Sequence, residues 1–153
     1  MKKIELLAPA GNLEKARIAL LYGADAVYVG GKMFSLRARA SNFDVSDIEE
    51  LCSFAKELNK KVYVTMNILP HDEDFTGLEE YILNLDKAGV DAIITSSLHI
   101  VRTALKIAPR MECHISTQMS IANSYTIEYY KQEGVKRVVL AREVSLEELN
   151  KIM

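Results

Sequence analysis

The sequence predicts an α/β fold of parallel β/α repeats, arranged as an incomplete TIM-type barrel of about six strands. Three segments share a pattern in which a glycine follows a helical stretch and a β-branched strand follows within two or three residues. They are YGADAVYVGG (22–31), AGVDAIITSS (88–97) and EGVKRVVLAR (133–142). Glycine favours the left-handed turn that ends a helix, so each pattern indicates a helix that runs into a strand. Strands that alternate with helices predict a parallel sheet with right-handed crossovers.

Three further apolar runs complete six predicted strands. They are IELLA (4–8), KVYVTM (61–66) and ECHIST (112–117). Apolar residues recur at helical spacing between the strands, beginning near Leu13, Ile48, Leu78 and Leu98. Capping boxes mark three expected helix starts: Ser46 with Glu49, Thr76 with Glu79, and Ser145 with Glu148. With no linker or low-complexity tract between them, these elements predict one domain over residues 1–153.

The alternation of side chains along two strands favours a barrel over a doubly wound sheet. Strand 61–66 places valines and a methionine on one face and Tyr63 and Thr65 on the other, with Asn67 following. The stretch ECHISTQ likewise alternates apolar residues with polar ones, namely His114, Ser116 and Gln118. A barrel tolerates polar side chains on its inner face near the carboxyl ends of the strands, whereas a doubly wound sheet is apolar on both faces. The first turn, APAGNLEK, also lacks the G-x-G-x-x-G of a dinucleotide fold.

Composition is typical of an ordinary globular protein. The 153 residues are 49% hydrophobic and 26% charged, with a formal net charge of −2. The two cysteines, Cys52 and Cys113, have no C-x-x-C spacing, which disfavours a zinc site or a disulfide framework and indicates a reducing compartment. No apolar stretch reaches 18 residues and the amino-terminal apolar run is short. We therefore expect a cytoplasmic protein without a membrane segment, and no metal site within this chain.

Several long segments together resemble peptidase family U32, the collagenase-like proteases. They are ELLAPAGNLEK (5–15), YGADAVYVGGKMFSLRARASNF (22–43), VYVTMNILPHDED (62–74), HISTQMSIANS (114–124) and VKRVVLAREVSLEEL (135–149). The resemblance covers essentially the whole chain and is nearest to the branch associated with tRNA wobble-uridine hydroxylation. The turn TSSLHI departs from the aspartate-proline-glycine turn that is more common in the family.

The resemblance implies that this chain is the N-terminal portion of a (β/α)8-like barrel whose cysteine-containing C-terminal part is absent. An iron–sulfur cluster is expected only in that absent part, so no cofactor is expected within this chain. The implied function is a component of tRNA wobble-uridine hydroxylation that binds tRNA, a nucleotide or a small anionic molecule, and this chain alone is expected to be inactive. The alternatives are a genuine collagenase-like endopeptidase and a non-catalytic domain that binds a partner.

Candidate site residues lie in the loops that follow the strands, where barrel sites assemble. The loop GKMFSLRARASNF (31–43) carries Arg37 and Arg39, whose guanidinium groups suit a carboxylate or phosphate. The alternative is a solvated basic loop. Asn67 is a candidate for orienting a ligand or for capping its own turn. His71 is a candidate proton carrier or an exposed loop residue.

The remaining candidates follow the last two strands. His114 is a candidate acid–base residue and Gln118 a candidate substrate contact, and both also fit a hydrogen-bond ladder inside the barrel. Ser116 is not in a G-x-S-x-G elbow and is not a convincing nucleophile. Arg142, at the expected end of the last strand, is a candidate for ligand contact or for an ion pair.

The two edge strands of a six-stranded barrel segment are expected to be unpaired. We expect Leu7, Val138 and Leu140 to point into the barrel, and the charges of both edges lie only at the strand ends. Such edges pair readily with other chains. The sequence therefore predicts self-association or completion of the sheet by another chain.

Overall fold

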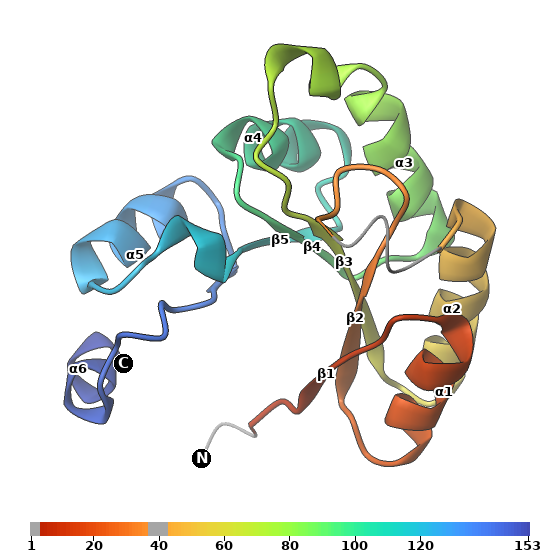
Figure 1. The fold of residues 1–153 in the computed structure, drawn as a ribbon, viewed down its shortest axis with the longest axis horizontal. Coiled ribbons are helices and arrows are strands. Elements are labelled where there is room, and N and C mark those ends of the chain that lie inside the picture. The colour runs from red at the N-terminus through yellow and green to blue at the C-terminus, as the bar shows by residue number, and fades with distance from the viewer. Residues whose placement is uncertain (1–3, 37–42) are drawn as a thin grey trace.

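The computed structural model describes residues 4–36 and 43–153 and contains a curved sheet covered by helices on its outer side (Figure 1). Six strands lie in the order β1-β2-β3-β4-β5-β6, and all neighbouring strands are parallel. The first strand is at the edge of the sheet, as in a barrel, and not at its centre, as in a doubly wound fold. The predicted α/β half-barrel with an unreversed strand order is thus confirmed.

Each strand is followed by a helix. The strands are β1 (Leu7–Pro9), β2 (Ala26–Gly30), β3 (Lys61–Met66), β4 (Ala92–Thr95), β5 (Glu112–Ile115) and β6 (Arg137–Val138). The α-helices are α1 (Leu13–Leu21), α2 (Val45–Glu57), α3 (Leu78–Ala88), α4 (Leu98–Ile107), α5 (Ser124–Gln132) and α6 (Leu146–Ile152). Two short 3₁₀ helices, η1 (Asp72–Phe75) and η2 (Thr117–Met119), lie in the loops after β3 and β5.

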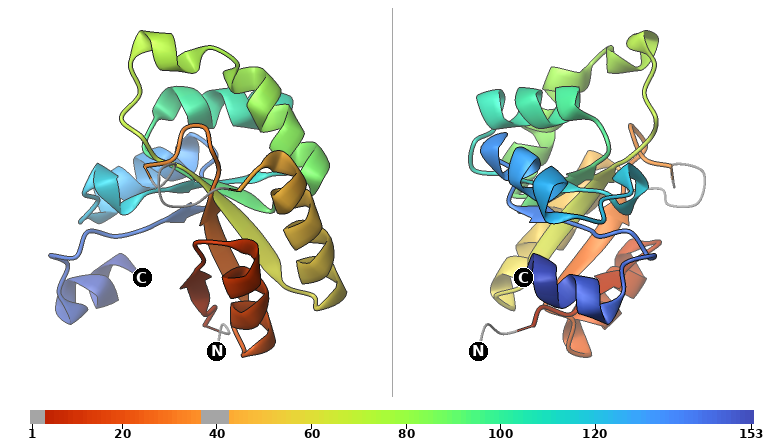
Figure 2. Two further views of the ribbon diagram at one scale, coloured as in Figure 1. Left: turned by 45° about the vertical axis from the view of Figure 1, so that its right-hand side comes forward. Right: turned by 90° about the vertical axis from the view of Figure 1, so that its left-hand side faces the viewer.

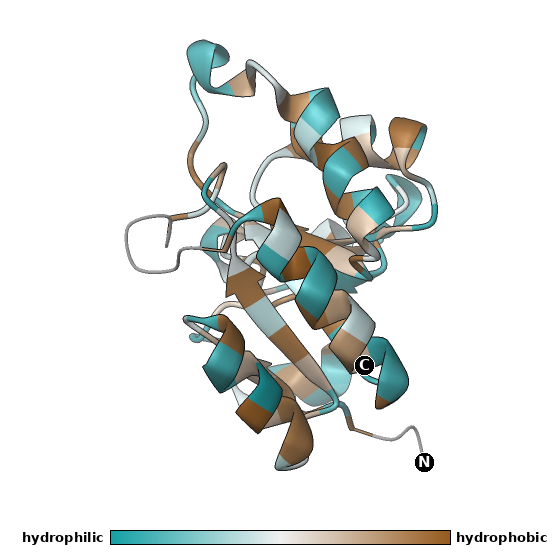
Figure 3. Cartoon of the chain, turned by 90° about the vertical axis from the view of Figure 1, so that its right-hand side faces the viewer, coloured by the Kyte–Doolittle hydropathy of each residue, from teal (hydrophilic) through white to brown (hydrophobic). Residues whose placement is uncertain are grey.

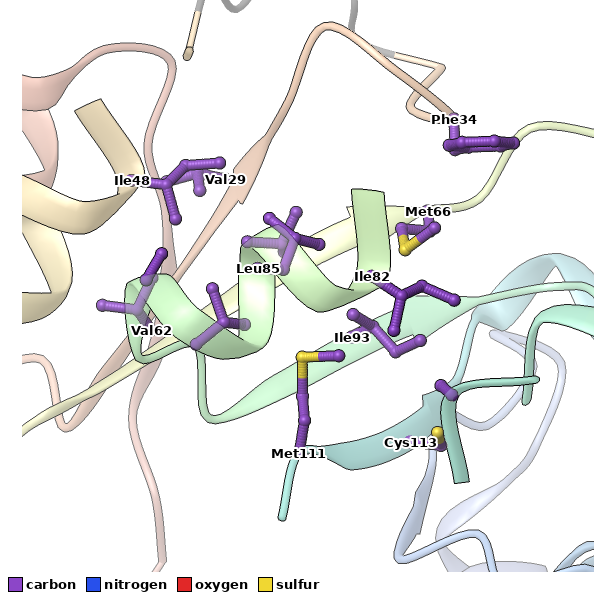
Figure 4. Packing of buried hydrophobic residues seen from close by; sticks show 14 of the residues in the cluster. Val29, Phe34, Ile48, Val62, Met66, Ile82, Leu85, Ile93, Met111 and Cys113 are labelled. Atoms are coloured by element: carbon purple, nitrogen blue, oxygen red, sulfur yellow. The ribbon is translucent and has the colours of Figure 1, made fainter. Parts of the chain in front are cut away.

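The two faces of the sheet are packed differently. Val62, Val64 and Met66 of β3 are fully buried in the main core between the sheet and the helices (Figure 4). Tyr63, between Val62 and Val64 in sequence, belongs to a second small cluster on the inner face of the sheet. We call the space on this side of the sheet the lumen. The opposite placement of Tyr63 confirms the predicted alternation in β3. The helices alternate apolar and polar residues along their length (Figure 3), so that an apolar side of each is available to the sheet.

Aspartates at the turns before β2 and β4 attach those turns to the preceding strand. The Asp25 carboxylate accepts a hydrogen bond from the Leu6 N–H (3.0 Å), and the Asp91 carboxylate accepts one from the Val62 N–H (2.8 Å). The corresponding position before β6 is Lys136, whose own N–H donates to the Cys113 carbonyl (3.0 Å). The repeated G-x-D pattern is therefore a structural device that fixes where two strands begin.

The edge strands are shorter than predicted. β1 begins at Leu7 and not at Ile4, because its neighbour β2 begins at Ala26, which pairs with Leu7. Leu6 is 60% exposed. β6 contains only two residues, although the Val139 N–H still donates to the Ile115 carbonyl (2.9 Å).

Val138 and Leu140 do not point into the lumen, so this prediction was wrong. Val138 is paired with Ile115, and both Val138 and Leu140 pack against the main core beneath the helices. The inner position on β6 belongs instead to Arg137. Leu7 does lie on the lumen side, beside the inner cluster.

Two of the three predicted capping boxes were also wrong. α2 starts two residues earlier, with Asp44 as its N-cap and the Asp47 carboxylate accepting the Asp44 N–H (2.9 Å). α3 starts after Gly77, whose φ of +79° suits glycine and displaces Thr76 from the cap. The third box is confirmed, because the Ser145 hydroxyl accepts the Glu148 N–H (3.2 Å).

Gly31, directly after β2, is held against the ring of Tyr81 on α3. A Cβ at Gly31 would overlap the Tyr81 hydroxyl oxygen and lie 3.3 Å from Cζ. Tyr81 is 6% exposed, its hydroxyl has no hydrogen-bond partner among the described residues, and burial raises its pKa to about 12. The loop after β2 therefore depends on the absence of a side chain at Gly31.

We predict that Gly31→Ala lowers the free energy of unfolding by about 1–3 kcal/mol, because the added methyl group overpacks this contact. Tyr81→Phe, which removes an unpaired buried hydroxyl, should change it by less than about 1 kcal/mol. Combining the two should recover part of the loss in urea denaturation. Gly11→Ala is the control, since nothing lies within 4 Å of a Cβ there. An equal loss in the control, or no recovery in the double variant, would contradict the packing argument.

Candidate functional site

The carboxyl ends of the strands form one end of the half-barrel, which we call the mouth. Asn67, just after β3, uses its side-chain oxygen to accept the Leu36 N–H from the loop after β2 (3.3 Å). Beneath this contact the hydroxyls of Ser35 and Thr65 share a hydrogen bond of 2.8 Å, and both residues are 4% exposed. Within the described part of the chain, the Asn67 side chain therefore does not cap its own turn. It fixes the neighbouring loop.

The loops after β2, β3 and β4 are joined in series at the mouth. The Phe34 carbonyl accepts the Ile68 N–H (3.0 Å), and the Ile68 carbonyl accepts the Ser96 hydroxyl (3.1 Å). Phe34 is 6% exposed, its ring lies 5.8 Å from that of Tyr81, and its φ is +59°. A bulky residue in the left-handed region is strained and persists only where its surroundings hold it. Such strain is frequent at functional sites.

Arg37 and Arg39 lie outside the described residues. The described residues that flank their segment are both anchored: Leu36 bonds to Asn67, and Phe43 is 2% exposed and forms a parallel bridge with Gly31. The chain therefore leaves and rejoins the described structure at the mouth.

The three polar residues His114, Ser116 and Gln118, which alternate with apolar ones in the sequence, lie at two depths in the half-barrel. His114 and Ser116 are buried, at 1% and 4% exposure. Gln118 has left the strand for η2 and is exposed. Its side-chain oxygen accepts the Ser116 hydroxyl (3.3 Å), and its N–H donates to the same hydroxyl (3.4 Å). Gln118 is thus the member nearest the mouth, as predicted.

His114 belongs to a cluster deeper in the lumen, the floor cluster, made of Glu5, Tyr63, Glu112, His114 and Arg137. The His114 Nε2 lies 2.9 Å from a Glu112 carboxylate oxygen, and its ring meets Tyr63 edge-on at 4.9 Å. The Tyr63 hydroxyl donates to Glu5 (2.9 Å), which also accepts two hydrogen bonds from Arg137. Burial lowers the pKa of His114, and Glu112 partly offsets this. The hydrogen bond from Arg137 lowers the pKa of Glu5.

The other two candidates are exposed. His71 precedes η1, with 81% of its side chain accessible, and its N–H donates to the Asp74 carboxylate (2.7 Å). Arg142 lies beyond the end of β6 in the loop before α6. The structure therefore brings Asn67 against the arginine-bearing loop and Gln118 against Ser116, but it separates His71 from His114.

Four residues of the floor cluster, Glu5, Tyr63, Glu112 and Arg137, were not among the predicted site residues. Glu112 lies two residues before His114 on the same face of β5, so the alternation of side chains along the strand could have identified it. Arg137 was missed because Val138 was assigned to the inner face. Glu5 lies before β1, and its contacts with Tyr63 and Arg137 hold it at the amino-terminal end of the strands.

The residues present do not fit an iron–sulfur cluster. Such clusters are held by several cysteine thiolates, whereas this chain has two cysteines. Cys52 and Cys113 are both packed in the core beneath the helices, and burial raises the pKa of each thiol to about 12. Among residues 4–36 and 43–153, no group of three or more potential metal-binding side chains was found. No described helix is long and apolar enough to cross a membrane.

Parallel β/α units with a polar mouth define this chain as part of a TIM-type barrel protein. The chain belongs to peptidase family U32, whose family model matches residues 11–153. It is 48% identical over 151 residues to tRNA hydroxylation protein P1 of Bacillus subtilis (strain 168), covering 99% of this chain and 36% of that protein. It is 38% identical over 150 residues to the 23S rRNA 5-hydroxycytidine C2501 synthase of Escherichia coli (strain K12), covering 98% of this chain and 22% of that enzyme.

The fold is also that of a solved family structure. A U32 peptidase structure superposes with a TM-score of 0.77 over 98% of this chain and 64% of that chain, at 12% sequence identity, which shows the shared fold alone. The chain spans about a third or less of the length of the two curated relatives above.

We predict that the imidazole of His114 titrates below its ordinary pKa of about 6.5, and that Glu112→Gln lowers this pKa further by removing the carboxylate that favours the charged ring. Because the folded pKa is depressed, the stabilisation from neutral His114 is present above the unfolded pKa. It is lost as the pH falls through the folded value. NMR titration of the imidazole protons between about pH 4 and 8 measures both effects. Glu128→Gln on α5 is the control, and titration of His114 at or above 6.5 would contradict the prediction.

Proposed function

We propose that this chain forms the N-terminal part of the barrel of an RNA-hydroxylation protein and that its mouth binds a nucleotide or another small anion. The names of the two curated relatives support RNA as the substrate class. tRNA, with a wobble uridine as the modified base, is the substrate that we propose. The chain's contribution is to bind and orient the nucleotide, because its two buried thiols do not suit a redox centre.

The observation that carries this proposal is the hydrogen-bonded series of loops at the mouth. Asn67 fixes Leu36, the residue directly before the segment that contains Arg37 and Arg39. A strained, buried Phe34 anchors the same loop to the one after β3. Guanidinium groups recognise phosphate through paired hydrogen bonds, and the anchored flanks reduce the entropy that binding would otherwise cost.

Peptidase chemistry is the second candidate, favoured by the name of the family and by relatives named as a collagenase and a protease. A nucleophile needs a base within hydrogen-bonding distance. Among the described residues the Ser116 hydroxyl bonds to Gln118 and the His114 Nε2 to Glu112, so these two candidates do not form such a pair. Both cysteine thiols are buried and hard to ionise.

We predict that Arg37→Ala combined with Arg39→Ala lowers the affinity for uridine 5′-monophosphate at least about tenfold, because two charge-assisted contacts are lost. The free energy of unfolding should change by less than about 0.5 kcal/mol. Isothermal titration calorimetry and urea denaturation measure the two quantities. Lys106→Ala with Lys131→Ala, on the outer helices, is the control of equal charge. An equal effect in the control, or unfolding of the arginine variant, would refute the assignment of this loop. Failure of the parent chain to bind the nucleotide would refute the proposed function.

We also propose that the edges of the sheet associate with another chain. β1 and β6 are the edge strands of the described sheet, and the side between β1 and α6 has no covering helix in the described structure (Figure 2). Leu6 and Ile18, next to the β1 edge, are 60% and 48% exposed, and Leu21 is 61% exposed. Exposed apolar groups beside an unpaired strand favour association.

We predict that the chain elutes with a mass greater than that of one chain in size-exclusion chromatography with light scattering. Leu6→Lys should shift it toward the monomer, because a charge beside an edge strand opposes pairing. Leu69→Lys is the matched control, since Leu69 is 80% exposed in the loop after β3, away from either edge. A monodisperse monomer at high concentration, or an equal shift in the control, would contradict this proposal.

A further inference from the structure

A cavity lies at the end of the half-barrel opposite the mouth. It is a groove of about 650 Å³ between the carboxyl ends of α2 and α3, beside the starts of β3 and β4. Its charged lining includes five cationic side chains, those of Lys56, Lys60, Lys61, Lys87 and Arg110. None of the candidate residues at the mouth contributes to it.

Two of the three carboxylates in the groove are already engaged by the protein itself. Asp86 forms an ion pair with Arg110 (2.8 Å). Asp91 accepts the Val62 N–H (2.8 Å), and its half-buried position raises its pKa. Glu49 is the remaining acidic side chain of the lining. The solvent-facing charge of the groove is therefore set mainly by its lysines.

Three of these lysines are exposed: Lys56, Lys61 and Lys87. Lysines near helix carboxyl ends commonly compensate the helix dipole. Here, however, the end of α3 is already supplied with donors, because the Arg110 guanidinium donates to the Asp86 carbonyl (2.7 Å). Lys61 is on a strand and not on a helix. Lys56 and Lys87 lie in the last turns of α2 and α3, so Lys61 is the exposed ammonium group that no helix end accounts for.

The lining also indicates what kind of ligand the groove accepts. It contains no aromatic side chain on which a base or sugar could stack. Exposed ammonium groups bind phosphate as point charges, a contact that is independent of sequence and that strengthens as salt is removed. A phosphodiester backbone that runs along the groove matches this chemistry better than a small aromatic ligand does.

We propose that this groove binds the phosphate backbone of RNA, at the end of the barrel opposite the nucleotide-binding mouth. This inference rests on the proposed function, which makes RNA the substrate class. An RNA held at both ends would place one nucleotide at the mouth while lysines at the far end retain the rest of the chain.

The test compares two triple variants of equal charge. The groove variant is Lys56→Gln, Lys61→Gln and Lys87→Gln, and the control is Lys15→Gln, Lys106→Gln and Lys131→Gln. A fluorescein-labelled oligouridylate of about 20 nucleotides exceeds the roughly 4–16 nucleotides that one domain usually covers. Anisotropy is measured over a series of salt concentrations, and urea denaturation checks that both variants remain folded.

We expect the groove variant to bind at least about tenfold more weakly at low salt. The slope of log affinity against log salt should fall by about 2, since each lost phosphate contact removes about 0.7 for single strands. The control should retain most of its affinity. Equal loss in both variants would overturn the proposal, and so would equally effective competition by polyglutamate, which would indicate a site for acidic proteins.

The same measurements separate this inference from the proposed function. A parent chain that binds oligouridylate and uridine 5′-monophosphate, with a groove variant that binds both unchanged, would overturn the groove alone. A parent chain that binds neither would overturn both.

Discussion

The ion pair between Glu5 and Arg137 can form only because the sheet curls. These residues come from the two ends of the sheet, 132 positions apart in the sequence, and bond to each other across the lumen, where Glu5 also accepts the Tyr63 hydroxyl. β1 and β6 are not neighbours in the sheet, so the contact requires the four strands between them to bend around a common axis. The two side chains are 22% and 37% exposed, so water screens their attraction in part. The pair therefore adds little stability by itself, and it reports a curvature that the packed core maintains.

That curvature explains why the alternation of apolar and polar side chains along the strands was the most informative signal in the sequence. A curved sheet has an outer face against the helices and an inner face against the lumen, so Val64 and Thr65 experience different surroundings. The alternation in β3 and β5 was sufficient to predict a barrel and its strand order. The same signal failed on β6, where Val138 and Val139 give no contrast in polarity and the choice of face depends on pairing with β5. Helix starts failed for a similar reason, because Ser46 and Asp44 are both competent caps and tertiary packing selects between them.

The candidate site was only partly predictable. Asn67 and Gln118 were correctly placed at the mouth because each follows a strand, and parallel strands end at the same side of the sheet. It could not show that Asn67 binds Leu36, since hydrogen bonds between loops depend on backbone geometry that the sequence does not encode locally. For His114 the sequence left two readings open, an acid–base residue and a member of a hydrogen-bond ladder inside the barrel. Its partner Glu112 and the edge of Tyr63 place His114 within the floor cluster.

The two ends of the half-barrel therefore have different physical roles. At the mouth, buried hydroxyls and a strained Phe34 hold three loops in one arrangement, which is what precise positioning of a small ligand requires. At the opposite end, exposed lysines on helix ends and a strand form a polar groove with no aromatic contact, which suits binding without sequence preference. The floor cluster occupies the lumen near the amino-terminal ends of the strands, where Arg137 at the start of β6 bonds to Glu5 just before β1. A ligand long enough to contact both ends would be positioned precisely at the mouth and bound without sequence preference at the lysine-lined groove.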